Sequence, residues 1–352
     1  MNTTWDLIIV GSGIAGLSAA LEAEGLKTLI LTGTKEGSGG SSSRAQGGIA
    51  CALDQADVSS LIADTLASGA GSADRLAVEV LVKEGLESLP WMESKGIEFD
   101  RGRDGLYQRG QEGAHSRRRV LHIGGDATGR GLQEPLLARV KENPLITLQT
   151  GSLVVGLLGG AGPQGPAIAG VRVLEDSGTV RDIFAPRVLI ASGGLGQLFG
   201  HTTNPLEVRG LCHWLAWQAG VPLADLEMVQ FHPTGLDAPL PEGVVDSEWL
   251  GSSPLLSEAL RGEGAVLVDS LGQPIPIDHP MGSLGSRDIV ARSIHKLLAQ
   301  GKKVFLDTRP IHRFHKKFPT ISRACALRGL DPVTTPLPVV PVVHYHMGGD
   351  FD

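Results

Sequence analysis

Gly11, Gly13 and Gly16 have the spacing of a dinucleotide-binding turn. Residues 6–10 before them have the composition of a buried strand, and the apolar residues after them are spaced as on one face of a helix. The glycines of such a turn permit a tight bend, close approach of the backbone to a pyrophosphate and close helix–strand packing. The helix N-terminus offers free N–H groups and a positive dipole end to phosphate. The pattern predicts a nucleotide-binding unit; a glycine-rich turn in another kind of α/β protein is the alternative.

The end of the next strand departs from this pattern. Residues 27–31 supply a strand that closes a unit of about 30 residues. An acidic side chain at its end would bind the adenosine ribose, but residues 32–35 are Thr, Gly, Thr and Lys. Either another polar group binds the ribose, or the nucleotide is held less tightly.

Two further segments rich in glycine could lie against the same ligand. Residues 36–48 are dense in Gly and Ser, so backbone donors there can approach a ligand closely, although a flexible linker has the same composition. Residues 192–194, Ser-Gly-Gly, follow a strand predicted over 187–191. Ligands of α/β proteins bind at such strand ends.

The elements that would position these segments alternate between strands and helices, which predicts an α/β fold. The expected helices span residues 58–68, 74–95, 126–142, 206–220 and 288–300, and the expected strands 154–158, 168–174, 180–184, 265–268 and 304–306. The three strands between 154 and 184 suggest an antiparallel excursion. Prolines become frequent after Ala224. We therefore expect a Rossmann-like domain over 1–232, an inserted α+β domain over 233–338 and a return to the first domain over 339–352.

Composition limits the partners and the compartment. The chain has 352 residues, enough for two domains, with 41% hydrophobic and 20% charged residues. A net charge of −7 gives no reason to expect nucleic acid or an anionic membrane as a partner. No run approaches the ~18 apolar residues of a membrane helix. A strand starting at Asp6 leaves no room for a signal peptide, and three widely spaced cysteines suit a reducing compartment, so we expect a cytoplasmic protein without a metal site.

Ten ordered motifs extend over nearly the whole chain. They are GSGIAG (11–16), RAQGGIA (44–50), EGAHSRRRVLH (112–122), DATGR (126–130), ASGGLGQLF (191–199), TTNP (202–205), QFHPTGL (230–236), LLSEALRGEGA (255–265), SRDIVAR (286–292) and VVHYHMGG (342–349). On these the chain resembles the L-aspartate oxidases, within the succinate dehydrogenase/fumarate reductase flavoprotein family. The resemblance implies FAD in a two-dinucleotide-type fold, a capping domain over the isoalloxazine and oxidation of a C4 dicarboxylate.

The resemblance also implies the residues that contact FAD. They are Gly11, Ser12, Gly13, Ile14, Ala15, Gly16, Lys35, Ser41, Ser42, Ala45, Gln46, Gly47, Gly48, Ser192, Gly193 and Gly194. Ser41 stands where the dehydrogenase branch has the histidine that links flavin covalently, so non-covalent FAD is expected. Leu211 stands where such proteins usually have an aspartate that helps hold the adenosine part. Family members are also longer, so we expect the C-terminal part, with its late FAD-binding segment, to be lacking.

Six further residues match substrate-site positions of the family. Arg287 matches the proposed proton-transfer residue and suits carboxylate binding, because guanidinium forks match carboxylate geometry; pairing with Asp288 is the structural alternative. His232 and His344 resemble substrate-carboxylate ligands, whereas His346 is expected to be incidental. The remaining matched positions are Ser257, for which helix capping is the alternative, Glu258 and Glu112. The run 117–119, three arginines, is expected to be solvated, with one arginine pairing an acid.

Glu112 separates two chemistries. A carboxylate beside a dicarboxylate site repels succinate and fumarate but pairs with the ammonium of aspartate. The sequence therefore predicts oxidation of L-aspartate to iminosuccinate with O2 or fumarate as acceptor, the step before quinolinate formation in NAD synthesis, with quinolinate synthase as a partner. A soluble fumarate reductase and an inactive flavoprotein fragment that serves as a scaffold are the alternatives.

Overall fold

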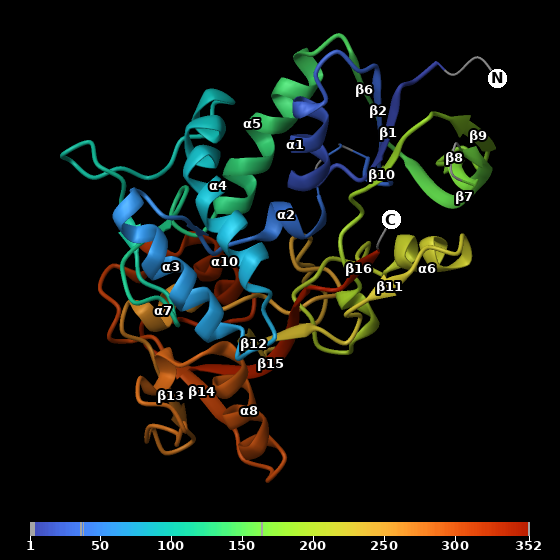
Figure 1. Ribbon diagram of the computed structural model, residues 1–352. Helices are drawn as coiled ribbons and strands as arrows, with labels where there is room; N and C mark the ends of the chain where they lie inside the picture. Colours follow the sequence, from blue (N-terminus) through green and yellow to red (C-terminus); the bar gives the residue numbers. More distant parts are fainter. Residues whose placement is uncertain (1–3, 36, 38, 163–164, 351–352) are drawn as a thin grey trace.

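The computed structural model describes residues 4–350 except 36, 38 and 163–164. Residues 36 and 38 of the predicted loop 36–48, and the first three and last two residues of the predicted domains, therefore lie outside the described residues. Its organising element is a parallel sheet of four strands in the order β10-β1-β2-β6 (Figure 1). The strands are β1 (Leu7–Val10), β2 (Thr28–Leu31), β6 (Ile146–Gln149) and β10 (Val188–Ile190). The predicted α/β class is confirmed.

Alternate residues of β1 point to opposite faces and enter two different cores. Leu7 and Ile9 pack with the helices α1 (Ile14–Glu22) and α5 (Thr128–Glu142), which lie side by side in Figure 1. Ile8 and Val10 pack on the other face with an antiparallel sheet and helix α6 (Leu211–Gln218). The central strands β1 and β2 are thus buried on both faces, which explains their nearly continuous apolar sequences.

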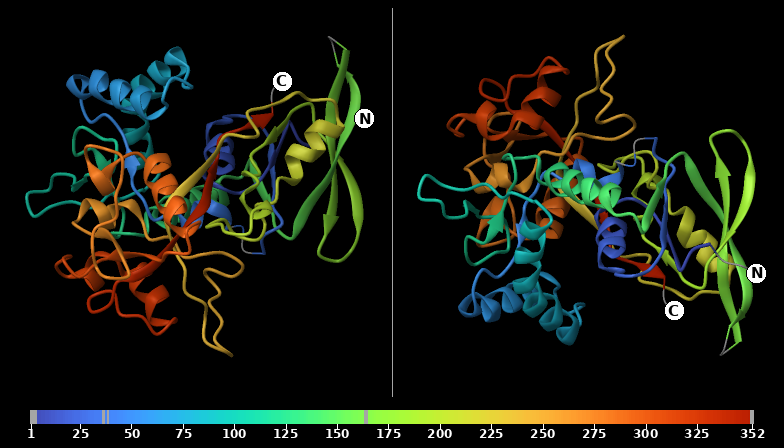
Figure 2. Two further views of the ribbon diagram at one scale, coloured as in Figure 1. Left: turned by 90° about the horizontal axis from the view of Figure 1, so that it is seen from below. Right: turned by 90° about the horizontal axis from the view of Figure 1, so that it is seen from above.

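The antiparallel sheet is the excursion expected between residues 154 and 184. Its strands are β7 (Ser152–Gly162), β8 (Gly165–Glu175) and β9 (Val180–Phe184), in the order β7-β8-β9. Figure 2 shows this sheet at one end of the molecule and the segments coloured orange to red at the other.

The predicted helices form, with one correction. α3 (Gln55–Ser68) and α4 (Arg75–Ser94) are each preceded by an aspartate whose side chain accepts a backbone N–H of the first turn. α6 spans Leu211–Gln218 and not 206–220. The prediction placed its start too early, because residues 205–210 form turns that end in a left-handed Gly210 (φ +71°), outside the helical region.

A second sheet has the order β12-β15-β14-β13 and carries the elements expected after residue 232. Its strands are β12 (Val229–Leu236), β13 (Val266–Asp269), β14 (Val304–Asp307) and β15 (Leu337–His346). Helix α8 (Arg287–Leu298) buries Val290 and Ile294 in the core of this sheet. Both predicted domain boundaries, 232/233 and 338/339, fall within paired strands β12 and β15, and the division itself stays a prediction.

Short elements complete the fold. They are α2 (Gly40–Arg44), β3 (Ile49–Ala50), β4 (Arg109–Gly110), β5 (Val120–Leu121), β11 (Leu223–Ala224), α7 (Glu258–Gly262), α9 (Phe314–Lys317), α10 (Pro319–Ala326) and β16 (Gly349–Asp350). Among the described residues, no helix is both long and apolar enough to cross a membrane.

One buried carboxylate, that of Asp126, connects helix α5 of the first part of the chain to helix α10 of the second. Asp126 precedes α5 and accepts the backbone N–H groups of Thr320 and Ile321 at the start of α10, at 3.3 and 3.2 Å. It is 2% exposed. Free N–H groups at a helix start need such acceptors, so Asp126 caps a helix that belongs to the other part of the chain.

Asp126→Ala should lower the free energy of unfolding by about 1 kcal/mol, because two N–H groups of α10 lose their acceptor. Asp126→Asn keeps one acceptor oxygen and should lose less. Thermal unfolding of the three proteins measures this. An alanine variant as stable as the wild type would show that the cap contributes nothing.

Candidate active site

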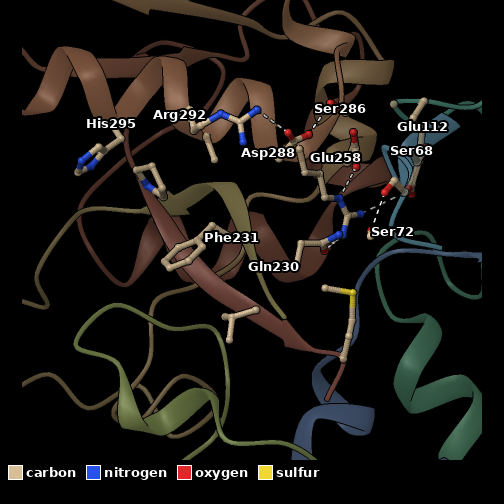
Figure 3. A pocket seen from close by; sticks show the side chains of 18 of the residues that line it. Ser68, Ser72, Glu112, Gln230, Phe231, Glu258, Ser286, Asp288, Arg292 and His295 are labelled. Atoms are coloured by element: carbon tan, nitrogen blue, oxygen red, sulfur yellow. Dashed lines mark hydrogen bonds and ion pairs between the residues drawn. The ribbon is translucent and has the colours of Figure 1, made fainter. Parts of the chain in front are cut away.

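A cavity of about 790 Å3 opens between the end of α3, the turn over 112–115, β12, β15 and α8. Figure 3 shows Glu112, Gln230 and Glu258 facing one another in it. Its lining combines carboxylates and cations with apolar side chains such as Phe231 and Val340. Charged groups of both signs in one concave site are what a small zwitterion needs.

Arg287, the first residue of α8, is held by groups from two other elements. Its Nε donates to Oε2 of Glu258 at 2.7 Å, and one terminal nitrogen donates to Oε1 of Gln230 at 2.8 Å. The alternative pairing with Asp288 does not occur, because that carboxylate contacts Ser286 and Arg292. The guanidinium is 28% exposed and lines the cavity, so it can bind an anion there.

Glu258 is a buried carboxylate between two guanidinium groups. Its Oε1 lies 3.2 Å from Arg261, whose side chain is fully buried. Burial alone would raise the pKa of Glu258, but Arg287 and Arg261 outweigh it and the pKa is lowered. The backbone N–H of Gly113 also binds this carboxylate, and a β-carbon at Gly113 would lie 2.1 Å from Oε1, so a larger residue there would displace the carboxylate.

Glu112 lies in the same cavity with an uncommitted oxygen. The residue is 8% exposed. Its Oε2 is 3.9 Å from Arg287, too far for a hydrogen bond, and Oε1 lies 3.6 Å from Nε2 of His122. Oε1 has no hydrogen-bond partner among the described residues. A buried carboxylate in this state can accept a hydrogen bond from a cationic ligand.

His232 on β12 and His344 on β15 face each other, with ring centroids 5.3 Å apart. The backbone N–H of Thr234 donates to Nδ1 of His232 at 3.2 Å, so the neutral ring carries its proton on Nε2. That nitrogen is buried without a partner in the described part of the chain. Nδ1 of His344 shares a hydrogen bond of 2.8 Å with the hydroxyl of Thr203.

Burial, helped by the charge of Arg287, keeps both imidazoles neutral. It lowers the pKa of His232 well below its ordinary value and the pKa of His344 to about 3. Ser257 adds a third neutral group. It precedes α7, but its hydroxyl makes no capping bond, and its oxygen is buried without a partner among the described residues. The capping alternative for Ser257 is therefore not observed.

The predicted nucleotide turn has the required backbone geometry. A β-carbon at Gly11 (φ +118°) would lie 2.3 Å from the carbonyl oxygen of Ala191, and one at Gly16 would lie 2.1 Å from that of Gly11. At the end of β2, where an acid would stand, the hydroxyls of Ser12 and Thr32 are hydrogen-bonded at 3.0 Å. These hydroxyls are the polar groups available there in place of a carboxylate.

The segment after residue 40 lies against this turn. The backbone N–H of Ile14, which follows Gly13, donates to the hydroxyl of Ser42 at 3.1 Å. Ser41 binds Asn204. Gln46 is 3% exposed, yet neither of its amide atoms has a hydrogen-bond partner among the described residues. Unsatisfied buried amide atoms beside a nucleotide turn fit a bound FAD with polar ring edges.

The other predicted FAD contacts lie around the same turn. Ala45 accepts the backbone N–H of Gly129 on α5 at 2.8 Å, which fixes the segment containing Gly47 and Gly48. The segment 192–194 follows β10, next to β1 in the sheet. Lys35 is the exception: it is exposed, and within the described part of the chain no side-chain contact ties it to the turn.

Several site residues were missed from the sequence. Gln230, Thr203, Thr234 and Arg261 hold the predicted residues, and they stand inside the motifs QFHPTGL, TTNP and LLSEALRGEGA. Proximity within those motifs was the signal that could have found them. In the run 117–119, the exposure of Arg117 and Arg118 and the pairing of Arg119 with acids of α3 fit the expectation. The burial of Arg119 does not.

Comparison with known proteins identifies the family to which the chain belongs. A family model described as an FAD-binding domain matches residues 6–349. The chain belongs to this family. FAD as the cofactor is therefore confirmed, while its non-covalent attachment stays a prediction.

The relatives agree with the resemblance. An L-aspartate oxidase of Mesorhizobium japonicum is 42% identical over 97% of this chain and 64% of its own length. One of Mycobacterium tuberculosis is 40% identical over 98% of the chain and 64% of its own. The chain thus spans less than two thirds of these relatives. A quinol fumarate reductase structure from E. coli has 28% identity and a TM-score of 0.85, covering 99% of this chain and 62% of that one.

Acid should destabilise this FAD-binding domain through its neutral histidines. His344 has a folded-state pKa of about 3, below the ~6.5 of an unfolded chain. Between these values only the unfolded chain takes up the proton, so stability is fully present above pH 6.5 and falls as the pH falls toward 3.

His344→Asn, which cannot take up this proton in either state, should show a smaller fall in melting temperature between pH 7.5 and pH 5 than the wild type. Exposed His312→Asn serves as the control. Equal falls in wild type and His344→Asn would contradict the assignment.

Proposed function

We propose that this chain carries the flavin and substrate sites of an L-aspartate oxidase, which oxidises L-aspartate to iminosuccinate with O2 or fumarate as acceptor. The observation that carries the proposal is Glu112, which lines the same cavity as Arg287 and whose Oε1 has no hydrogen-bond partner among the described residues. The identity to L-aspartate oxidases supports it. The step would precede quinolinate formation in NAD synthesis, with quinolinate synthase receiving the unstable imine.

Bound FAD would supply the two-electron acceptor. The chain's own residues bind and orient the substrate. Arg287 binds a carboxylate and, as the resemblance implies, takes part in proton transfer. Nε2–H of His232, the hydroxyl of Ser257 and His344, which are buried outside the residues that line the cavity, would offer neutral groups to the carboxylates. Glu112 accepts the ammonium. Glu258 and Arg261 hold the Arg287 guanidinium in place.

The residues proposed to hold FAD are the turn at 11–16 and the segment at 41–48, with residues 192–194 and Lys35 at its edges. The unpartnered amide of Gln46 and the helix N-terminus of α1 support this assignment.

Two alternatives have observations in their favour. The likeness to quinol fumarate reductase favours a soluble fumarate reductase, against which Glu112 stands. Leu211, in place of the usual aspartate, favours an inactive flavoprotein with a scaffold role. Flavin absorbance of the purified protein separates the second alternative from the other two.

Non-covalent FAD follows from Ser41, whose hydroxyl binds Asn204 and offers no imidazole for a flavin linkage. Precipitation of the yellow protein with acid should release all flavin into the supernatant. Colour that remains in the washed pellet would contradict this.

Glu112→Gln should raise KM for L-aspartate about ten- to a hundredfold, because a charge-assisted hydrogen bond of roughly 1.5–3 kcal/mol is lost. Turnover of fumarate should hold or improve, since fumarate has no ammonium and meets only repulsion from Glu112. Steady-state kinetics of the flavin-loaded protein with both substrates tests this.

Two further variants complete the experiment. Arg287→Leu should depress both reactions, because every dicarboxylate needs that cation. Glu84→Gln, at an exposed position of α4, should change neither. Equal losses for the two substrates in Glu112→Gln would remove the discrimination role and leave Glu112 a structural residue.

A further inference from the structure

A buried arginine outside the cavity ties the turn that bears Glu112 to helix α3. Arg119 is 1% exposed although it follows two exposed arginines in the sequence. A guanidinium that is removed from water needs partners for most of its five donors. Here those partners come almost entirely from one face of α3.

Arg119 makes a bidentate contact with one carboxylate and two further hydrogen bonds, all to side chains of α3. Nε and one terminal nitrogen donate to the two oxygens of Asp57, at 2.9 and 3.0 Å. The same terminal nitrogen reaches the hydroxyl of Ser60 at 2.7 Å, and the other donates to Asp64 at 2.5 Å. Positions 57, 60 and 64 are spaced by three and four residues, so they share one face of the helix.

The same face binds the turn directly. Oδ2 of Asp64 accepts both the backbone N–H and the hydroxyl of Ser116, each at 2.8 Å. A terminal nitrogen of Arg119 also lies 3.3 Å from Nδ1 of His115. Residues 115, 116 and 119 are therefore fixed to α3 as one unit.

The backbone of the turn over 112–115 gives its conformation little support. His115 N–H donates to the carbonyl of Glu112 at a long 3.4 Å. Ala114 has a φ of +63°, a left-handed conformation that disfavours any residue with a β-carbon. Side-chain contacts therefore help to impose its shape. The amide of Gln111 donates to the carbonyl of His115 at 2.5 Å, Glu258 binds the N–H of Gly113, and α3 holds the far end of the turn through Asp64 and Arg119.

We infer that Arg119, through Asp57 and Asp64 of α3, is a positioning residue for the Glu112 carboxylate and thereby a determinant of selectivity for ammonium-bearing dicarboxylates. The inference rests on the proposed function, since Glu112 is the group that Arg119 would serve. Arg119 does not line the cavity, so it acts only through the turn.

The first measurement requires no activity. Arg119→Lys keeps the charge and the protease site but cannot form the fork to Asp57. Native trypsin digestion followed by mass spectrometry should show faster cleavage at residues 117 and 118 in this variant. Arg118→Lys, at an exposed neighbouring position, is the matched control and should be cleaved at the wild-type rate. An unchanged rate in Arg119→Lys would overturn the inference.

The second measurement is a double-mutant cycle in the flavin-loaded protein. Arg119→Lys should raise KM for L-aspartate about tenfold, with KM for fumarate changed by less than about threefold. In the Glu112→Gln background the same substitution should change KM for L-aspartate little, because the carboxylate that it positions is gone. Additive effects, or equal effects on both substrates, would show a purely structural role.

Asp64→Asn provides a milder variant should Arg119→Lys fold poorly, and it should give the same pattern with a smaller amplitude. The outcome is separable from the proposed function. If Glu112→Gln affects both substrates alike, the discrimination role of Glu112 in the proposed function fails. If Glu112→Gln discriminates but Arg119→Lys and Asp64→Asn do not, only the positioning role of Arg119 fails.

Discussion

The pairing of β12 with β15 is the constraint on which the site depends. These strands lie more than a hundred residues apart in the chain, and their antiparallel register places His232 opposite Val342, two residues from His344. The same ladder holds Gln230 against Arg287 of α8, which packs on it. A slip of one residue would turn these side chains to the opposite face. The buried core beneath α8 prevents such a slip, since Val290 and Ile294 are fully buried there.

Charge is balanced within the site itself. Arg287 and Arg261 face Glu258 and Glu112, while burial keeps the two histidines neutral. Buried ions persist only when they are paired and hydrogen-bonded. Glu258, enclosed by both arginines and by the backbone of Gly113, meets that condition fully, so it acts as a fixed anchor. Glu112 meets it only in part, because its Oε1 has no hydrogen-bond partner among the described residues and its Oε2 lies 3.9 Å from Arg287.

The local elements were readable from the sequence because local rules decide them. The turn at 11–16 needs glycines, and the strands and helices around it follow apolar periodicity. The start of α6 was not readable, because the turns before it depend on a left-handed Gly210. The partners of the site were not readable either. Arg119 is one of three consecutive arginines, and their sequence pattern does not distinguish it from the other two. It is buried because helix α3 packs against it in the folded chain. Long-range contacts such as Gln230 to Arg287 leave no trace in spacing.

The distance between Glu112 and Arg287 is the physical basis of the selectivity that we propose for the site. At 3.9 Å the two charges attract but form no hydrogen bond, so each retains capacity for another partner. A fumarate dianion would satisfy Arg287 and leave Glu112 facing a like charge in a buried site. L-Aspartate brings a carboxylate for Arg287 and an ammonium for Glu112, so both ions gain a partner at once. A site that leaves a buried charge unpaired for the wrong ligand discriminates more strongly than one that only adds a contact for the right one. If the proposed function holds, the same carboxylate that pairs with the ammonium of L-aspartate would also weaken the binding of fumarate relative to L-aspartate.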